Sequence, residues 1–168
     1  MSNRVPRALW AAGAAACALL LGYGYFLQHV QGLEPCPLCL VQRAFFYAVM
    51  AAFAVAAIHG PGRTGAIVYA ILVSLFAIGG LATASRQVWL QHLPADQVPQ
   101  CGPDLFFMLE NFPLAQTLKK LAAGSGECAK VDWTFLGFSI AEWSLACFIA
   151  LAVYALWLAL RGSRRAAA

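Results

Sequence analysis

The chain has 168 residues, of which 62% are hydrophobic and 11% are charged. Soluble domains are about 45–50% apolar and about 25% charged, so this composition excludes an ordinary water-soluble protein. The formal charge of +4 is modest, and we expect no nucleic-acid partner. The length suits one domain. We therefore predict a single integral membrane domain over residues 1–168, surrounded by a lipid bilayer.

Four apolar runs are long enough, or nearly so, to cross a membrane. A helix needs roughly 20 residues, with a range of about 17–25, to cross about 30 Å of hydrocarbon. Glycines and alanines inside the runs are compatible with helix, because small residues let helices pack closely in lipid. The sequence predicts an all-α membrane protein, a four-transmembrane-helix bundle with spans at about residues 9–28, 40–58, 66–83 and 143–160.

The basic residues indicate the orientation of the bundle. Six of the eleven Lys and Arg lie where the cytoplasm would be if both termini were inside: Arg4, Arg7, Arg63, Arg161, Arg164 and Arg165. All seven acidic residues fall on the other side. We therefore predict cytoplasmic N- and C-termini and two outer loops, at about residues 29–39 and 85–142. The alternative for the first run is a cleaved signal peptide, but the run is longer than the apolar core of such peptides.

The second outer loop has a structure of its own. Prolines predict extended chain on both sides of Cys101. Asp104 is then a candidate cap for a short amphipathic helix, and the apolar stripe continues after Pro113. The stripe consists of Leu105, Met108, Leu109, Phe112, Leu114, Leu118 and Leu121. We expect this segment to lie in the membrane interface; the alternative is a small subdomain packed above the bundle. Residues 124–126 predict a flexible joint before Cys128.

Four of the six cysteines lie on the outer side, where disulfides persist. Cys17 and Cys147 lie within spans and are interpreted as small apolar packing residues. Cys36 and Cys39 form a C-x-x-C pair at the start of the second span, whereas Cys101 and Cys128 both lie in the second loop.

The C-x-x-C pair is predicted to be reactive rather than structural. Its disulfide would close too small a ring to stabilise a fold much through loop entropy. Pro37 suits the first turn of a helix, and helix N-termini favour the thiolate form of cysteine. Arg43 follows Cys39 by four residues, so it lies on the same helix face one turn deeper. An ionisable residue at that depth is a candidate functional residue.

Two structural alternatives remain open for the four outer cysteines. A zinc site would use C-x-x-C as one half, but Cys101 and Cys128 lack the matching close spacing, so we predict no metal site. Two purely structural disulfides are the second alternative, and four cysteines allow three pairings. Neither alternative explains why one pair adjoins a membrane arginine.

The layout favours electron transfer by thiol–disulfide exchange. A loop disulfide between Cys101 and Cys128 would be attacked by an incoming thiolate, and Cys36 and Cys39 would reoxidise the loop pair. The electrons must then leave the protein, and no haem, flavin or iron–sulfur motif is present in the sequence. A quinone is the remaining lipid-soluble acceptor, and Arg43 is a candidate donor to a quinone carbonyl.

The sequence resembles the bacterial disulfide-bond formation protein B (DsbB) family over nearly its whole length. The resemblance rests on Cys36-Pro-Leu-Cys39-Leu-Val-Gln-Arg43, on the loop pair Cys101 and Cys128, and on Trp133-Thr-Phe-Leu-Gly137. It implies an inner-membrane oxidoreductase that reoxidises DsbA, a periplasmic thiol oxidase, and passes electrons to membrane quinone, either ubiquinone or menaquinone. The vitamin K epoxide reductase class shares the four-helix bundle and the C-x-x-C pair, but in that class the loop cysteines precede the C-x-x-C.

The resemblance also implies a role for each site residue. Cys101 resembles the loop cysteine that the partner attacks, and Cys128 resembles its loop mate. Cys36 resembles the cysteine that exchanges with the loop pair, and Cys39 the one that contacts quinone, with Arg43 beside it. Some family members carry a histidine near the quinone where this chain has Gln87, so Gln87 is a candidate quinone-site residue. A different thioredoxin-like partner and a metal-binding or transport bundle are the competing interpretations.

Overall fold

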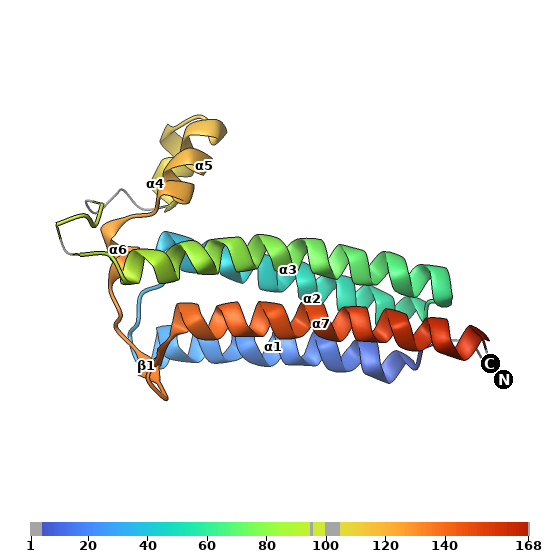
Figure 1. Cartoon of the computed structure of the whole chain (residues 1–168). Coiled ribbons are helices and arrows are strands. Elements are labelled where there is room, and N and C mark those ends of the chain that lie inside the picture. The colour runs from blue at the N-terminus through green and yellow to red at the C-terminus, as the bar shows by residue number, and fades with distance from the viewer. Residues whose placement is uncertain (1–4, 95, 100–104, 168) are drawn as a thin grey trace.

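Four long helices lie side by side and alternate in direction (Figure 1). The computed structural model describes residues 5–94, 96–99 and 105–167. The long helices are α1 (Arg7–Val30), α2 (Pro37–His59), α3 (Arg63–Gln91) and α7 (Ile140–Ala167). Each is long and apolar enough to cross a membrane, which confirms the predicted four-helix membrane bundle. We call the end where α2 begins the cysteine end, and the opposite end, where α1 begins, the terminal end.

The helices are longer than the predicted spans, and the largest difference is in α3. This helix continues to Gln91, about two turns beyond the predicted end of the third span at residue 83. The helix thus extends past residue 85, where the second outer loop was predicted to begin, and the polar residues after Thr83 belong to the helix. Gln87 is in fact buried on the inner face of the helix, at 4% exposure.

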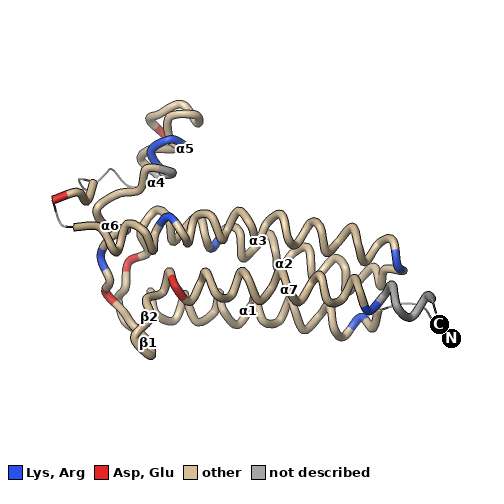
Figure 2. The backbone as a smooth tube through the Cα atoms, in the orientation of Figure 1, with Lys and Arg blue, Asp and Glu red and all other residues tan. Residues whose placement is uncertain are grey.

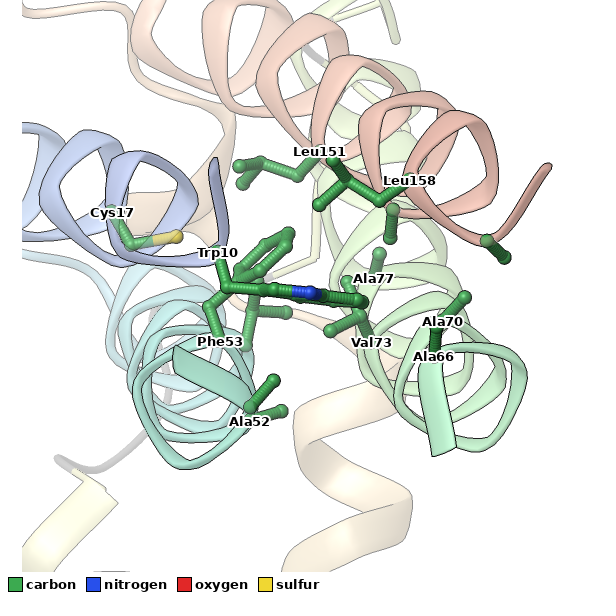
Figure 3. Packing of buried hydrophobic residues seen from close by; sticks show 14 of the residues in the cluster. Trp10, Cys17, Ala52, Phe53, Ala66, Ala70, Val73, Ala77, Leu151 and Leu158 are labelled. Atoms are coloured by element: carbon green, nitrogen blue, oxygen red, sulfur yellow. The ribbon is translucent and has the colours of Figure 1, made fainter. Parts of the chain in front are cut away.

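The core is densest toward the terminal end. Figure 3 shows the indole of Trp10 (α1) lying across the middle of the bundle, between Phe53 of α2 and the small residues that line α3. Nearer the cysteine end, the rings of Phe46 and Phe148 stack with centroids 4.1 Å apart. Gly80 lies directly against Phe148, where a Cβ atom would overlap the ring. Small residues at such contacts let membrane helices approach closely.

The long helices are unevenly paired. α2 packs along both α1 and α3, and α3 packs along α7, whereas α1 and α7 make few contacts with each other. Tyr154 of α7 donates a hydrogen bond to the carbonyl of Leu9 in α1 over 2.7 Å, at the terminal end. The two helices therefore meet at one end and leave room between them toward the other.

The second loop forms three short helices and a hairpin. They are α4 (Leu105–Asn111), α5 (Leu114–Ala123), α6 (Gly126–Ala129), β1 (Thr134–Phe135) and β2 (Phe138–Ser139). In Figure 1, α4 and α5 stand to the side of the bundle near the cysteine end, on the side of α3, and the hairpin lies on the opposite side, beside α1 and α7.

The predicted amphipathic segment is helical and is divided at Pro113, as expected. Thr117 of α5 is buried and donates to the carbonyl of Met108 in α4 over 3.0 Å, so the two short helices pack on each other. Leu109 and Leu114 are more than half exposed. The interfacial position of this segment stays a prediction, and the predicted cap at Asp104 lies outside the described residues.

Charge separates along the bundle (Figure 2). The described acidic residues lie near or beyond the cysteine end. The described charged residues at the terminal end are basic, with Arg7 opening α1, Arg63 opening α3 and Arg161 near the end of α7. The helices therefore have one end that is basic and one that carries both signs.

Candidate active site

The C-x-x-C pair is built into the start of α2. Cys36 is the N-cap residue, in an extended conformation, and Pro37 opens the helix, as predicted. The backbone N–H of Cys39 donates to the sulfur of Cys36 over 3.3 Å. The sulfurs of Cys36 and Cys39 lie 2.8 Å apart. A thiol thus takes the place of the hydroxyl or carboxylate that usually caps a helix, and the two sulfurs are held in contact.

The loop cysteine Cys128 lies against this pair. It is fully buried in α6 and packs in one cluster with Cys36, Leu38 and Leu90. Its sulfur lies 3.6 Å from the hydroxyl of Ser125. The structure therefore brings together three of the four predicted redox cysteines, with Cys36 between the other two. Cys101 lies outside the described residues.

A close-packed turn brings Cys128 to this position. Gly124 has a φ of +78°, which side chains other than glycine rarely adopt. The side chain of Leu90 occupies the space that a Cβ of Gly124 would need, and Leu38 lies just beyond it. Ser125 is 8% exposed, and the carbonyl of Ala123 accepts a hydrogen bond from Arg86 of α3 over 2.9 Å. The expected flexible joint is thus a packed turn fixed to α3.

The contact between Cys36 and Cys128 divides their acidities. Because the thiol of Cys36 hydrogen-bonds to the sulfur of Cys128, the pKa of Cys36 is raised and the pKa of Cys128 is lowered to about 6. Hydrogen bonds from the backbone of Ser125 and Leu38 favour the Cys128 thiolate further, and burial opposes them. When Cys36 and Cys128 are both reduced, the proton therefore stays on Cys36 and the negative charge lies on Cys128.

An amide from α3 reaches both sulfurs of the C-x-x-C pair. The Nε2 of Gln87 donates to Cys36 over 3.4 Å and to Cys39 over 3.3 Å. The Oε1 of Gln87 accepts a hydrogen bond of 2.7 Å from Gln42, which is itself buried at 3% exposure. Gln42 thereby sets the orientation of the Gln87 amide and points its N–H groups at the sulfurs. Hydrogen bonds donated to sulfur favour a thiolate.

A cavity of about 520 Å³ opens beside the pair, between α1 and α7. Cys36, Cys39, Arg43 and Gln87 line it together, so four of the predicted site residues share one space. The walls are otherwise largely apolar and aromatic, and they include Leu20, Tyr23, Leu27, Phe46, Trp133, Phe135, Trp143 and Cys147. The stacked ring of Phe46 forms the floor. A cavity with apolar walls and a few convergent polar groups has the form of a small-molecule site.

Arg43 is positioned by α1 rather than by the cysteines. One Nη donates to the side-chain oxygen of Gln28, and the other donates to the carbonyl of Gly24 over 3.0 Å. Its guanidinium also lies 4.8 Å from the centre of the Tyr25 ring. Gln87, and not Arg43, is therefore the side chain that donates to the sulfurs, while Arg43 forms part of the cavity wall.

Two residues that sequence reasoning missed belong to this site. Gln42 stands three residues after Cys39, on the same helix face, and its polar side chain among apolar neighbours was the available signal. Cys147 was interpreted as packing only, but it is half-buried and lines the cavity. Cys147 follows Trp143 by about one turn of α7. The sequence alone does not reveal that Cys147 lines a cavity, because it does not show which face of α7 turns inward.

Fold and site together define a membrane protein with a C-x-x-C dithiol at one end of a four-helix bundle. A family model described as disulfide bond formation protein DsbB matches residues 6–158. The chain is 50% identical to disulfide bond formation protein B of Aromatoleum aromaticum over 92% of this chain and 93% of that one. The corresponding protein of Hahella chejuensis is 53% identical, with 80% of this chain and 81% of that one covered. Disulfide bond formation protein B 1 of Pseudomonas aeruginosa is 46% identical, with coverages of 86% and 89%. The chain belongs to the DsbB family of disulfide bond formation proteins and is a multi-pass membrane oxidoreductase.

Proposed function

We propose that the protein reoxidises a DsbA-like periplasmic dithiol oxidase and passes the electrons to a membrane quinone. The observation that carries this proposal is the placement of the C-x-x-C pair between two surroundings. Cys36 contacts the loop cysteine Cys128, and both Cys36 and Cys39 line a cavity with largely apolar walls that opens between two membrane helices. The pair thus lies between the loop cysteine on one side and the membrane cavity on the other.

The first half of the reaction is thiol–disulfide exchange. The reduced partner attacks a Cys101–Cys128 disulfide, becomes oxidised to its own disulfide and leaves the loop pair as a dithiol. The thiolate of Cys128 then attacks the sulfur of Cys36 in a Cys36–Cys39 disulfide, and Cys39 leaves as a thiolate. The Gln87 amide, held by Gln42, donates to that leaving sulfur. The thiolate of Cys101 then attacks Cys128 in the mixed disulfide between Cys36 and Cys128, and Cys36 leaves as a thiolate. The loop disulfide is thereby formed again, and the electron pair resides on Cys36 and Cys39.

The cavity fits a quinone as the acceptor of that electron pair. Its volume of about 520 Å³ accommodates a substituted ring, and its largely apolar walls suit a ring and the start of an isoprenoid tail. The guanidinium of Arg43 is available to hold a carbonyl oxygen, whereas the N–H groups of Gln87 already donate to the sulfurs of Cys36 and Cys39. A bound quinone supplies an acceptor for two electrons and two protons. Arg43 has five N–H donors, of which two are used by α1, so it can also donate to an oxygen in the cavity.

We further infer that the protein lies in the bacterial inner membrane with both termini in the cytoplasm. The basic terminal end supports this orientation, since cytoplasmic ends of membrane helices are rich in Lys and Arg. It places the cysteines in the periplasm, where disulfides form and persist. The substrate of the relay is therefore a periplasmic dithiol.

The test is steady-state turnover of purified protein with reduced DsbA and a soluble quinone. Cys36→Ser and Cys39→Ser should each give no measurable turnover, because each breaks the exchange chain. Cys17→Ala is the matched control, since Cys17 is buried in the core away from the cavity, and it should turn over like the wild type. Wild-type turnover by Cys39→Ser would refute the proposed function.

A second experiment identifies the partner and the site of the acceptor. Cys128→Ala should accumulate a mixed disulfide between Cys101 and the partner; capture of a different thioredoxin-like protein, and none of DsbA, would refute the assignment of the partner. In a Cys36→Ser/Cys39→Ser variant, alkylation of Cys147 by a small apolar thiol reagent reports on the cavity. Added quinone should slow that alkylation, and an unchanged rate would place the quinone elsewhere.

A further inference from the structure

The hairpin between α6 and α7 carries an unusual residue at its tip. Thr134 pairs with Ser139 and Phe135 with Phe138, so Leu136 and Gly137 form a two-residue turn. Both have positive φ, 53° and 82°, as in a type I′ turn, where Asn-Gly and Asp-Gly are the favoured pairs. A leucine with positive φ is an outlier among residues with branched, bulky side chains. Its side chain is also 75% exposed, so packing within the protein does not explain it.

The residues around the tip make an apolar surface that is continuous with the membrane-spanning helices. Phe135 and Phe138 are each 53% exposed. Phe135 packs on Trp143 of α7 and on Trp133, with centroids 6.0 Å and 6.1 Å apart. Trp133 in turn meets Tyr23 of α1 at 6.0 Å. No residue from 133 to 141 is charged. The surface thus extends from the hairpin onto the outward faces of α1 and α7.

The hairpin lies at the depth where the bilayer surface is expected. Trp143 stands in the first turn of α7, and Tyr23 lies about two turns before the end of α1. Tryptophan and tyrosine are enriched at this level of membrane helices. The indole N–H of Trp143 donates to the carbonyl of Phe135 over 3.1 Å, which ties the hairpin to that level. In Figure 1 the hairpin projects to the side of the bundle, beside α1, rather than continuing the helix axes.

We propose that this hairpin is a membrane anchor whose tip, Leu136, inserts into the acyl-chain boundary of the surrounding lipid. The partner is the bilayer itself, because residues 133–141 carry no charge and the aromatic rings of the hairpin segment pack directly on Tyr23 of α1 and Trp143 of α7. Lipid contact accounts for a leucine in a turn position that favours asparagine. The anchor holds Trp133 and Phe135, two wall residues of the cavity, at the level of the lipid. The inference does not depend on which acceptor the cavity binds.

Photo-crosslinking of the full chain in lipid vesicles tests this placement. p-Benzoylphenylalanine replaces Leu136 in protein reconstituted into phosphatidylglycerol and phosphatidylcholine vesicles, and adducts are identified by mass. The matched control replaces Asp96, an exposed residue in the same outer loop. Lipid adducts should form at position 136 about tenfold more often than at position 96. Equal yields, or adducts at position 136 with added DsbA in place of lipid, would overturn the proposal.

Leu136→Asn separates a membrane role from a role in the turn. Asparagine suits a type I′ turn better than leucine does. If the tip of this hairpin lies in water, Leu136→Asn should therefore leave the stability of the hairpin unchanged or raise it. If lipid covers the tip, the amides of residues 134–139 should exchange with deuterium about tenfold faster in vesicles, as expected when one leucine side chain is lost from lipid. Leu136→Met, which keeps an apolar tip, should exchange like the wild type. Unchanged or slower exchange in Leu136→Asn would overturn the proposal.

Discussion

The two halves of the bundle use the same four helices in different ways. Toward the terminal end, Trp10, Phe53 and small residues of α3 fill the interior, and α7 is bonded to α1 through Tyr154. Toward the cysteine end, α1 and α7 part, and the space between them is a cavity with buried amides and sulfurs on one wall. The stacked pair Phe46 and Phe148 lies between the two halves. The same four helices are thus closely packed at one end and enclose a cavity at the other.

The largest expected effect is the loss of the amide on the open half. Gln87→Leu removes both hydrogen bonds to the sulfurs, and hydrogen bonds to a charged group are worth about 1.5–3 kcal/mol, or about ten- to a hundredfold in rate. We expect reduction of a soluble quinone by the reduced protein to slow by that factor in stopped-flow measurements. Gln87→His keeps a donor and should stay within a few-fold of the wild type. If Gln87→Leu is as fast as the wild type, the amide has no part in the reaction.

The packed half is tested by Gly80→Ala. The added methyl group overlaps the ring of Phe148, which is fully buried and stacked on Phe46. Overpacking of this kind costs about 1–3 kcal/mol, measured as the free energy of unfolding in detergent micelles. Gly22→Ala is the control, because a Cβ there would meet nothing within 4 Å, and it should not lower stability. Equal stabilities of the two variants would show that the helices adjust at Phe148.

A smaller effect is expected for Arg43, which links α2 to α1 at the wall of the cavity. Arg43→Ala removes the bonds to Gln28 and Gly24 and a donor to the cavity. We expect the apparent KM for a soluble quinone to rise about tenfold, while the rate of exchange with DsbA stays within about twofold. Arg43→Lys, which keeps the charge but not the planar fork, should fall between the two. Unchanged quinone kinetics would make Arg43 a residue of helix packing only.

The smallest expected effect is the loss of one thiolate, that of Cys128, as the pH is lowered. With all cysteines reduced, Cys128 has a pKa of about 6 because Cys36 donates a hydrogen bond to it. A lowered pKa means that the thiolate is present above about pH 6 and is lost as the pH falls below it. We expect one thiolate to disappear from the ultraviolet absorbance of the wild type between about pH 7 and pH 5, and this change to be absent in Cys128→Ser. In Cys36→Ala the same midpoint should move to higher pH. A midpoint independent of Cys36 would contradict the contact between the two sulfurs.

The sequence predicted the bundle well because lipid imposes a simple rule on length and polarity. Four apolar runs gave four helices, and Pro37 after Cys36 placed the dithiol at a helix start. The end of α3 was missed because hydropathy does not distinguish a polar residue in a loop from one that faces the interior of a helix bundle. Gln87 is of the second kind: its cost of burial is offset by Gln42 and the two sulfurs.

The remainder of the site depends on contacts between distant segments. The hairpin was not predicted, since Leu136 breaks the turn preferences that normally reveal one. The start of α7 carries a readable signal that was overlooked: Ser139 and Glu142 form a capping box, in which Glu142 accepts from the N–H of Ser139 over 2.6 Å. Ser139 also donates to Gln91 of α3 over 2.8 Å, a contact that no local pattern contains.

The packed turn at Gly124 sets a limit on how this protein can vary over evolutionary time. Upstream of it, the short helices α4 and α5 lie to the side of the bundle, so we expect insertions and deletions there to change little of what surrounds the dithiol. From Gly124 to Cys128 the chain has no such freedom, since a β-carbon at 124 meets Leu90 and one added residue would carry Cys128 away from Cys36. We expect relatives to differ in loop length before this glycine and to keep a constant spacing of four residues after it.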